Sequence, residues 1–249
     1  MNSGEAQEAV LIDLQGISFR YTTGGNYVLK DLSFRLRDGE RIGLVGPNGS
    51  GKTTLFHVIM GLLKPDKGKI RIFGKERREE KDFLPVRQQI GMLFQDPDDQ
   101  LFSPTVLEDV AFGPLNQGKT VPEAKEIARE TLRSLGLEQF EKRVTYRLSG
   151  GEKKLVSLAT VLAMKPKVLL LDEPTNGLDH DTTERIISVL NRIEISYIFI
   201  SHNMDFIAKT TDKIYGIRDG RIILDTKAIP HTHVHSHGYG ALPHTHSEE

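Results

Sequence analysis

The sequence predicts an α/β fold with a parallel sheet at its core, a small antiparallel sheet beside it and an inserted helical segment. Three observations lead to this fold class. The runs Val168 to Leu171 and Tyr197 to Ile200 are apolar on both faces, which is typical of central strands in a parallel sheet. Segments with apolar residues at helical spacing separate these runs. Near the start of the chain, Ile17 and Phe19 alternate with other residues as in a half-buried antiparallel strand.

The predicted elements follow one another along the chain. Alternation over Ile17, Phe19 and Tyr21, and again over Leu32, Phe34 and Leu36, predicts two antiparallel strands. Short apolar runs predict further strands at residues 42–45, 70–73, 90–94, 168–171 and 197–200. Helical spacing predicts helices over residues 53–63, 121–140, 152–164 and 182–193. We expect one domain over residues 1–229 and a flexible tail rich in histidine over residues 230–249.

Length and composition exclude several classes of protein. A chain of 249 residues, 38% of them apolar, can bury a full core. Its formal net charge of −1 gives no indication of a polyanionic partner, so we expect no nucleic acid. The absence of cysteine excludes disulfides and thiolate metal sites. The first residues lack the apolar core of a signal peptide, and no apolar run is long enough to cross a bilayer. Any membrane role is therefore expected to be peripheral, from the cytoplasmic face and through a partner.

One loop matches the phosphate-binding pattern G-x-x-x-x-G-K-[ST] between a predicted strand and a predicted helix. Its residues are Gly46, Pro47, Asn48, Gly49, Ser50, Gly51, Lys52 and Thr53, and Thr54 follows. Glycines let the backbone curl so that successive N–H groups point at a phosphate. We expect Lys52 to contact the β and γ phosphates and the Thr53 hydroxyl to hold Mg²⁺. The alternative is a structural turn, and the loop alone does not distinguish an ATPase from a kinase or a GTPase.

Two adjacent acids follow the apolar run 168–171. We expect Asp172 to hold Mg²⁺ through water, and Glu173 to accept a proton from the water that attacks the γ-phosphate. Carboxylates at a buried strand end are costly, which favours a functional role over a structural one.

Three more residues have two interpretations each. His202 follows the run 197–200 and either bonds the γ-phosphate or is a structural histidine. Gln95 follows the predicted strand 90–94 and either ligates Mg²⁺ or caps that strand. Tyr21 either offers an aromatic face to adenine or packs in the core.

A second candidate anion site lies just before the predicted helix 152–164. Ser149, Gly150 and Gly151 provide a hydroxyl and backbone N–H groups at a helix start. The alternative is an ordinary capping box, since Glu152 stands three residues after Ser149. A second anion site in a chain with one phosphate loop is explained if it serves the nucleotide of a neighbouring chain.

In this order, the motifs resemble those of the nucleotide-binding domain of ABC transporters, over roughly Leu11 to Asp225. Gly46 to Thr53 matches the Walker A motif of that family, Gln95 its Q-loop, Ser149 to Glu152 its signature, Val168 to Glu173 Walker B, Asp179 the D-loop and His202 the switch histidine. Glu152 departs from the glutamine that usually ends the signature.

The resemblance implies a P-loop NTPase core with a RecA-like parallel sheet, an antiparallel β subdomain and an inserted α-helical subdomain. It implies ATP and Mg²⁺ as cofactors. It also implies a head-to-tail pair in which the P-loop of one chain and Ser149, Gly150 and Gly151 of the other clasp the same ATP. The second chain would be another copy or a similar ATPase.

The segment from Phe94 to Val106, with Asp109 to Asn116 after it, resembles the energy-coupling-factor branch of the family, whose importers carry cobalt, nickel or vitamins. The resemblance implies a transmembrane coupling protein and a substrate-binding membrane subunit as partners, with Leu101 and Phe102 as apolar contacts. The alternative is a loop of the helical subdomain that carries no information about partners.

The end of the chain carries alternating histidines, namely His231, His233, His235, His237, His244 and His246. Alternate residues share a face in an extended chain, and neutral imidazoles suit Ni²⁺, Co²⁺, Cu²⁺ or Zn²⁺. The alternatives are a purification tag, against which the interleaved Thr, Val and Ser argue, and an end without a role. Together with the coupling segment, the tail favours cobalt or nickel as the cargo.

Two rival functions remain open at this stage. One is a vitamin importer of the same branch, with an incidental tail. The other is a soluble ABC ATPase of translation or DNA repair. The single P-loop and the short distance from Lys52 to Ser149, which leaves no room for a long coiled coil, argue against the second rival.

Overall fold

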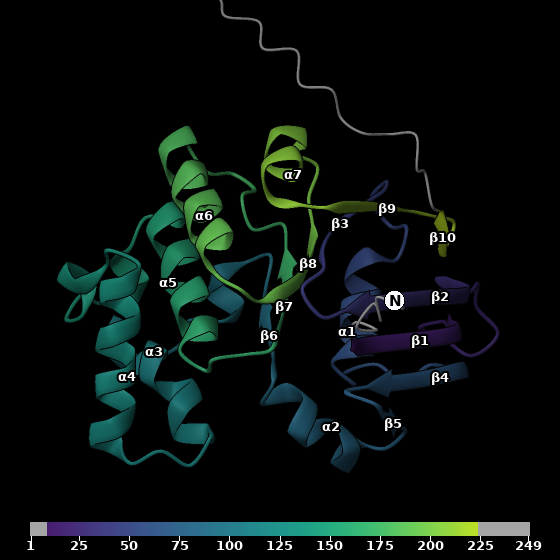
Figure 1. Ribbon diagram of the computed structural model, residues 1–249, viewed down its shortest axis with the longest axis horizontal. Helices are drawn as coiled ribbons and strands as arrows, with labels where there is room; N and C mark the ends of the chain where they lie inside the picture. Colours follow the sequence, from purple (N-terminus) through teal and green to yellow (C-terminus); the bar gives the residue numbers. More distant parts are fainter. Residues whose placement is uncertain (1–8, 224–249) are drawn as a thin grey trace, which may run out of the picture.

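The computed structural model describes residues 9–223 of the chain. Over this range the chain forms a small sheet, a larger sheet and a group of helices (Figure 1). The larger sheet lies between the small sheet on one side and most of the helices on the other (Figure 1). This is the fold of a P-loop NTPase with an antiparallel β subdomain and an inserted helical part, as the sequence predicts.

The small sheet is antiparallel throughout, with the strand order β2-β1-β4-β5. Its strands are β1 (Val10–Phe19), β2 (Leu29–Arg37), β4 (Lys67–Ile72) and β5 (Lys75–Arg77). A register shift at Gly16, whose φ is 63°, moves the buried side chains of β1 from even to odd positions. Extending the alternation to Tyr21 was wrong, because β1 ends at Phe19 and Tyr21 is 62% exposed.

The larger sheet has the strand order β10-β9-β3-β8-β7-β6. Its strands are β3 (Arg41–Val45), β6 (Ile90–Leu93), β7 (Val168–Asp172), β8 (Ser196–Ile200), β9 (Lys213–Arg218) and β10 (Arg221–Ile223). All neighbours pair in parallel except β9 and β10. Every residue of β7 and β8 is buried, which confirms the prediction of two central strands.

The two faces of this sheet belong to two different cores. Leu170 and Ile198 point to the face covered by the small sheet and by helix α1 (Lys52–Ile59). Leu169 and Phe199 point to the opposite core, which contains side chains of most other helices. These are α3 (Val106–Asn116), α4 (Val121–Ser134), α5 (Gly150–Leu162), α6 (His180–Arg192) and α7 (Met204–Thr210).

The predicted helices exist, with different ends. The predicted helix 53–63 stops at Ile59, just before Gly61 with its positive φ of 68°. The helix predicted to reach Phe140 stops at Ser134, because Gly136 (φ 66°) ends it and a 3₁₀ turn follows at Glu138–Phe140. The predicted helices 152–164 and 182–193 start and end earlier, as α5 and α6.

Some elements were not predicted. Helix α2 (Glu80–Arg87) buries only two apolar residues and contains Pro85, so it has almost no helical pattern. Helix α3 contains Gly113 and Pro114, and α7 has only seven residues. Strands β5, β9 and β10 are short or only half-buried, and therefore lack a clear alternation.

Candidate nucleotide-binding site

The loop at residues 46–51 joins β3 to the start of α1, as its motif requires. Two glycines are needed by its geometry. A Cβ on Gly46 would lie 2.2 Å from the backbone oxygen of Ile217, and Gly51 has a φ of 104° directly before α1. A side chain at either position would collide or strain the backbone, so the loop can curl this tightly only with glycine.

Lys52 lies across this loop. Its Nζ donates hydrogen bonds to the backbone oxygens of Gly46 at 2.7 Å and Pro47 at 3.0 Å. Burial lowers the pKa of Lys52, while Glu173 and Asp172 act in the opposite direction. Within the described residues the buried Ser50 hydroxyl has no hydrogen-bond partner, which fits a site that receives a phosphate oxygen.

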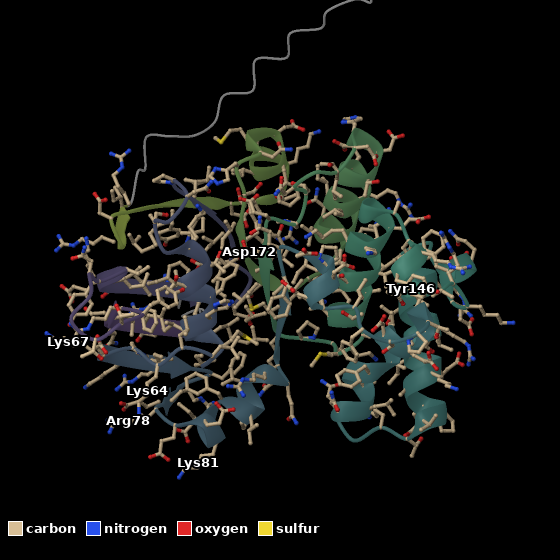
Figure 2. The ribbon with its side chains drawn as sticks, turned by 180° about the vertical axis from the view of Figure 1, so that it is seen from behind. Lys64, Lys67, Arg78, Lys81, Tyr146 and Asp172 are labelled. Carbon is tan, nitrogen blue, oxygen red and sulfur yellow. The ribbon has the colours of Figure 1, made fainter. Side chains whose placement is uncertain are left out.

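The Thr53 hydroxyl donates a 2.8 Å hydrogen bond to Oδ2 of Asp172 at the end of β7. Asp172 is almost fully buried, near the centre of the molecule (Figure 2), and burial raises its pKa, although the Thr53 bond lowers it. Gln95 lines the same hollow from the end of β6. A hydroxyl, a carboxylate and an amide oxygen form a donor set that suits Mg²⁺.

Glu173 has an unusual backbone, with a φ of 45° and its N–H bonded to the Ile200 oxygen at 3.0 Å. Its side chain is 13% exposed, and its Oε1 lies 3.4 Å from Nε2 of the more exposed His202. Burial raises the pKa of Glu173, His202 lowers it and Asp172 raises it further. The fold therefore places a carboxylate with a raised pKa beside the phosphate loop.

Most of the predicted nucleotide residues line one hollow of about 570 Å³. Among them are Tyr21, Asn48, Gly49, Gly51, Lys52, Thr53, Thr54, Gln95, Asp172 and Glu173. The Tyr21 hydroxyl lies 3.0 Å from that of Thr54, and its ring meets Phe19 edge to face. Because Tyr21 is exposed, its alternative role in core packing was wrong. Val28 and Ile200 also line the hollow and were missed, since single apolar residues give no motif.

Ser149, Gly150 and Gly151 lie elsewhere, at the start of α5, and line neither of the two hollows around Thr53. Ser149 and Glu152 form the capping box: the Ser149 hydroxyl accepts from the Glu152 N–H, and the Ser149 N–H donates to Glu152 at 2.8 Å. The Arg143 guanidinium donates to both oxygens of Glu152, to Oε1 at 2.6 Å and to Oε2 at 3.2 Å. The capping box offered as the alternative is therefore present. Ser149 and Gly150 remain exposed within it.

Comparison with known proteins agrees with this geometry. Residues 29–176 match the family model described as ABC transporter. A protein of Nitratidesulfovibrio vulgaris, named as an ABC transporter ATP-binding protein, is 50% identical over 236 residues, which cover 95% of this chain and 86% of that protein. The chain belongs to the ABC transporter family.

Other members of the family give further detail. The energy-coupling factor transporter ATP-binding protein EcfA of Methanocaldococcus jannaschii is 42% identical, over 86% of this chain and 77% of its own length. Two solved structures each superpose with a TM-score of 0.78. CbiO1 of Clostridium perfringens, part of the ABC transporter complex CbiONQ, is 36% identical over 87% of this chain and 88% of its own. The ADP- and phosphate-bound dimer of the ATP-binding cassette MJ0796 is 27% identical, over 85% of this chain and 96% of its own.

Membership of the family makes this an ATP-binding domain of the ATPase type that works in transporters. Its Walker A residues, Gln95 and its Walker B acids meet in one place. Asp179 of the D-loop caps α6, where its carboxylate accepts from the Thr182 N–H at 2.8 Å and from the Thr182 hydroxyl at 2.9 Å.

The segment after the Q-loop corrects one prediction. Leu101 is 8% exposed and packs in the core of the helical part, so it offers no contact to a partner. Phe102 is 66% exposed and packs edge to face on the exposed ring of Phe112, with 4.7 Å between the ring centroids. The buried Asp109 carboxylate fixes the turn by accepting from the N–H groups of Phe102 and Ser103.

The histidines of the tail, residues 231–246, lie outside the described residues. Within residues 9–223, no group of three or more His, Asp or Glu side chains forms a candidate metal site. Over the same range, none of the helices is both long and apolar enough to span a bilayer.

Proposed function

We propose that this chain is the ATP-hydrolysing subunit of an energy-coupling-factor importer, and that it works as a pair on a transmembrane coupling protein. The observation that carries the proposal is the hollow in which Lys52, Thr53, Asp172 and Glu173 come together. The likeness to EcfA and to CbiO1 of the CbiONQ complex supports the energy-coupling-factor type.

In the proposed reaction, water attacks the γ-phosphorus of ATP, a new O–P bond forms, and the bond to the bridging oxygen of ADP breaks. Glu173 takes the proton of the attacking water, a role that suits a carboxylate with a raised pKa. His202, beside Glu173, orients the water and the γ-phosphate. Lys52 and the N–H groups of the P-loop hold the phosphates, and Tyr21 stacks on adenine.

Mg²⁺, when bound, supplies positive charge that offsets the charge of the phosphates. The oxygen atoms of Thr53 and Gln95 would hold it directly, and Asp172 through water, since these three side chains line both adjoining hollows.

The signature residues Ser149, Gly150 and Gly151 complete the site of a second chain in this proposal. They begin a helix of 13 residues, whose N-terminal end attracts anions. They are at least partly exposed and do not reach their own P-loop hollow. The solved dimer of MJ0796 supports a pair, and we propose that the pair is head-to-tail, formed here by two copies or with a similar ATPase.

The membrane side of the proposal rests on the exposed aromatic pair of Phe102 and Phe112. Leu115, also exposed, lies near the end of α3, the helix that contains Phe112. Rings of this kind are common anchors at protein interfaces. We propose that they contact the transmembrane coupling protein at the cytoplasmic face, with a substrate-binding membrane subunit in the same complex.

The proposed cargo is cobalt or nickel. The support is the resemblance of the segment from Phe94 to Val106 to the energy-coupling-factor branch and the histidines of residues 231–246, which would bind the metal. Uptake of radioactive Ni²⁺ and Co²⁺ tests this in cells that lack the chain and are complemented with wild type, Glu173→Gln, or a chain ending at Ile229. Wild type should restore uptake of one metal and Glu173→Gln should not. Vitamin uptake is measured in the same cells. If wild type restored vitamin uptake but not metal uptake, the proposed cargo would be contradicted. If the shortened chain restored metal uptake as well as wild type does, the proposed role of the tail would be contradicted.

A further inference from the structure

One buried cation is not used by the reaction described above. Lys154, on α5, is 2% exposed, and its Nζ donates hydrogen bonds to the backbone oxygens of Phe94 at 3.1 Å and Gln95 at 2.6 Å. A buried ammonium is costly unless its hydrogen bonds are satisfied. Here two carbonyl groups, those of Phe94 and Gln95, accept two of its three N–H bonds, so the position of Lys154 and the path of this loop depend on each other.

The neighbouring contacts show that the Q-loop segment rests on α5. The Gln100 amide donates to the Ser157 oxygen at 2.8 Å and to the Thr160 hydroxyl at 2.7 Å, while its Oε1 accepts from the Phe94 N–H at 3.2 Å. These bonds fix the two ends of the segment, Phe94 and Gln100. Gln95 itself is exposed, and no hydrogen bond of its side chain to the described residues fixes it. The hydrogen bond from Lys154 to the Gln95 carbonyl is therefore the contact that fixes the backbone position of Gln95, from which its side chain extends.

The charge of Lys154 also acts on the same site. Burial lowers the pKa of Lys154, and the charges of Asp172, Asp96 and Glu173 act in the opposite direction, with Asp172 first among them. The charge of Lys154 thus interacts with the Walker B carboxylates, while its Nζ contacts the Gln95 carbonyl.

We propose that Lys154 is a positioning residue for Mg²⁺–nucleotide binding: by holding the Gln95 carbonyl it keeps the Gln95 amide beside Thr53 and Asp172. This inference rests on the proposed role of those three residues as the magnesium ligands. Residues that orient metal ligands typically change metal affinity by about 10- to 100-fold when they are replaced.

The test measures equilibrium binding of a fluorescent ATP analogue to the full chain, first in EDTA and then over a titration of Mg²⁺. Lys154→Met keeps the apolar stem and removes the ammonium. We expect it to raise the Mg²⁺ concentration for half-maximal enhancement of binding by about 10-fold. Affinity in EDTA should change by less than about twofold, since Lys52 and the P-loop are untouched.

Two further variants make the result specific. Lys154→Arg keeps the charge and donors and should restore most of the Mg²⁺ response. The matched control is Lys153→Met, which removes the neighbouring ion pair to the exposed Asp98; such pairs contribute little, so it should stay within about twofold of wild type. If Lys154→Met does not fold, Lys154→Gln replaces it, with the same expected shift.

A wild-type Mg²⁺ requirement in folded Lys154→Met or Lys154→Gln would overturn the inference, as would an equal loss of affinity in EDTA. Failure of Lys154→Arg to restore the response would also overturn it. If wild type itself showed no enhancement by Mg²⁺, the proposed ligand set would fail, which is a different result.

Discussion

The hydroxyl of Thr53 lies 2.8 Å from the carboxylate of Asp172, although 119 positions separate the two residues in sequence. The sheet explains this closeness. Strands β3 and β7 both pair in parallel with β8, so the loop after β3 and the acids at the end of β7 lie at the same edge of the sheet. The start of α1 and the end of β7 therefore form one site, and the predictions below concern what this site does.

Glu173→Gln removes the proposed general base but keeps the shape of the side chain. We expect ATP turnover to fall by at least about 100-fold, because proton transfer at such a site contributes roughly 10²- to 10⁴-fold. Nucleotide binding should remain, and ATP should stabilise the paired form. Turnover by phosphate release and size-exclusion chromatography with ATP measure the two effects. Glu184→Gln, at a partly exposed glutamate of α6 that pairs with Lys209, is the control and should turn over normally.

Asp172→Asn should stabilise the protein in the absence of nucleotide. Burial raises the pKa of Asp172, so the folded chain binds this proton more readily than the unfolded chain, and stability falls as pH rises from the unfolded pKa through the raised one. Asparagine removes this loss and still accepts from Thr53. We expect a higher melting temperature at pH 7, by about 2–4 °C for each kcal/mol gained, and no gain near pH 4, measured by calorimetry. An unchanged or lower melting temperature at pH 7 would contradict the destabilising effect assigned to this carboxylate. The control is Asp99→Asn, at an exposed position, which should leave the melting temperature unchanged.

Arg143→Met should weaken the start of α5. The hydrogen bonds from Arg143, and then from the Ser149 N–H, hold the pKa of Glu152 below its usual range. A lowered carboxyl pKa gives stability that is present above the unfolded pKa and is lost as pH falls through the folded one. Because the pair is partly exposed, we expect a loss of only about 0.5–1 kcal/mol at pH 7, which should shrink below pH 4. Denaturant unfolding at both pH values measures it, and a loss that does not depend on pH would mean that Arg143 acts through its packing on Phe140 instead.

The residues just discussed show what the sequence predicts well and what it does not. Lys52 was found because it ends a recognisable loop pattern after a strand, and Asp172 and Glu173 because two acids stand where an apolar strand ends. The strained φ of Glu173 and the burial of Leu101 were not predicted, since both depend on contacts between distant segments. The same reason hid Lys154, whose partners lie 60 and 59 positions away.

Replacing Phe102 and Phe112 together by serine should separate ATP hydrolysis from transport. Both rings are exposed and contact each other, so their loss should cost little stability and should leave the ATPase activity of the isolated chain within about twofold. Membrane association and metal uptake in cells should fall. Membrane fractionation measures this, with the exposed Tyr146→Ser as a control at another surface. Normal membrane association in the double variant would place the coupling surface elsewhere.

The central claim is that one ATP is held by the P-loop of one chain and the signature of the other, and a mixing experiment tests it most directly. Gly150→Asp suits this purpose, because a Cβ there meets nothing within 4 Å in its own chain and an acid is favourable at a helix start, yet it would face the phosphate of the partner's ATP. Lys52→Met disables the P-loop. Each variant alone should be nearly inactive. An equal mixture should regain about a quarter of wild-type turnover, since half of the pairs contain one intact site. Full activity of Gly150→Asp alone, or a mixture that stays inactive while pairs still form, would contradict the account.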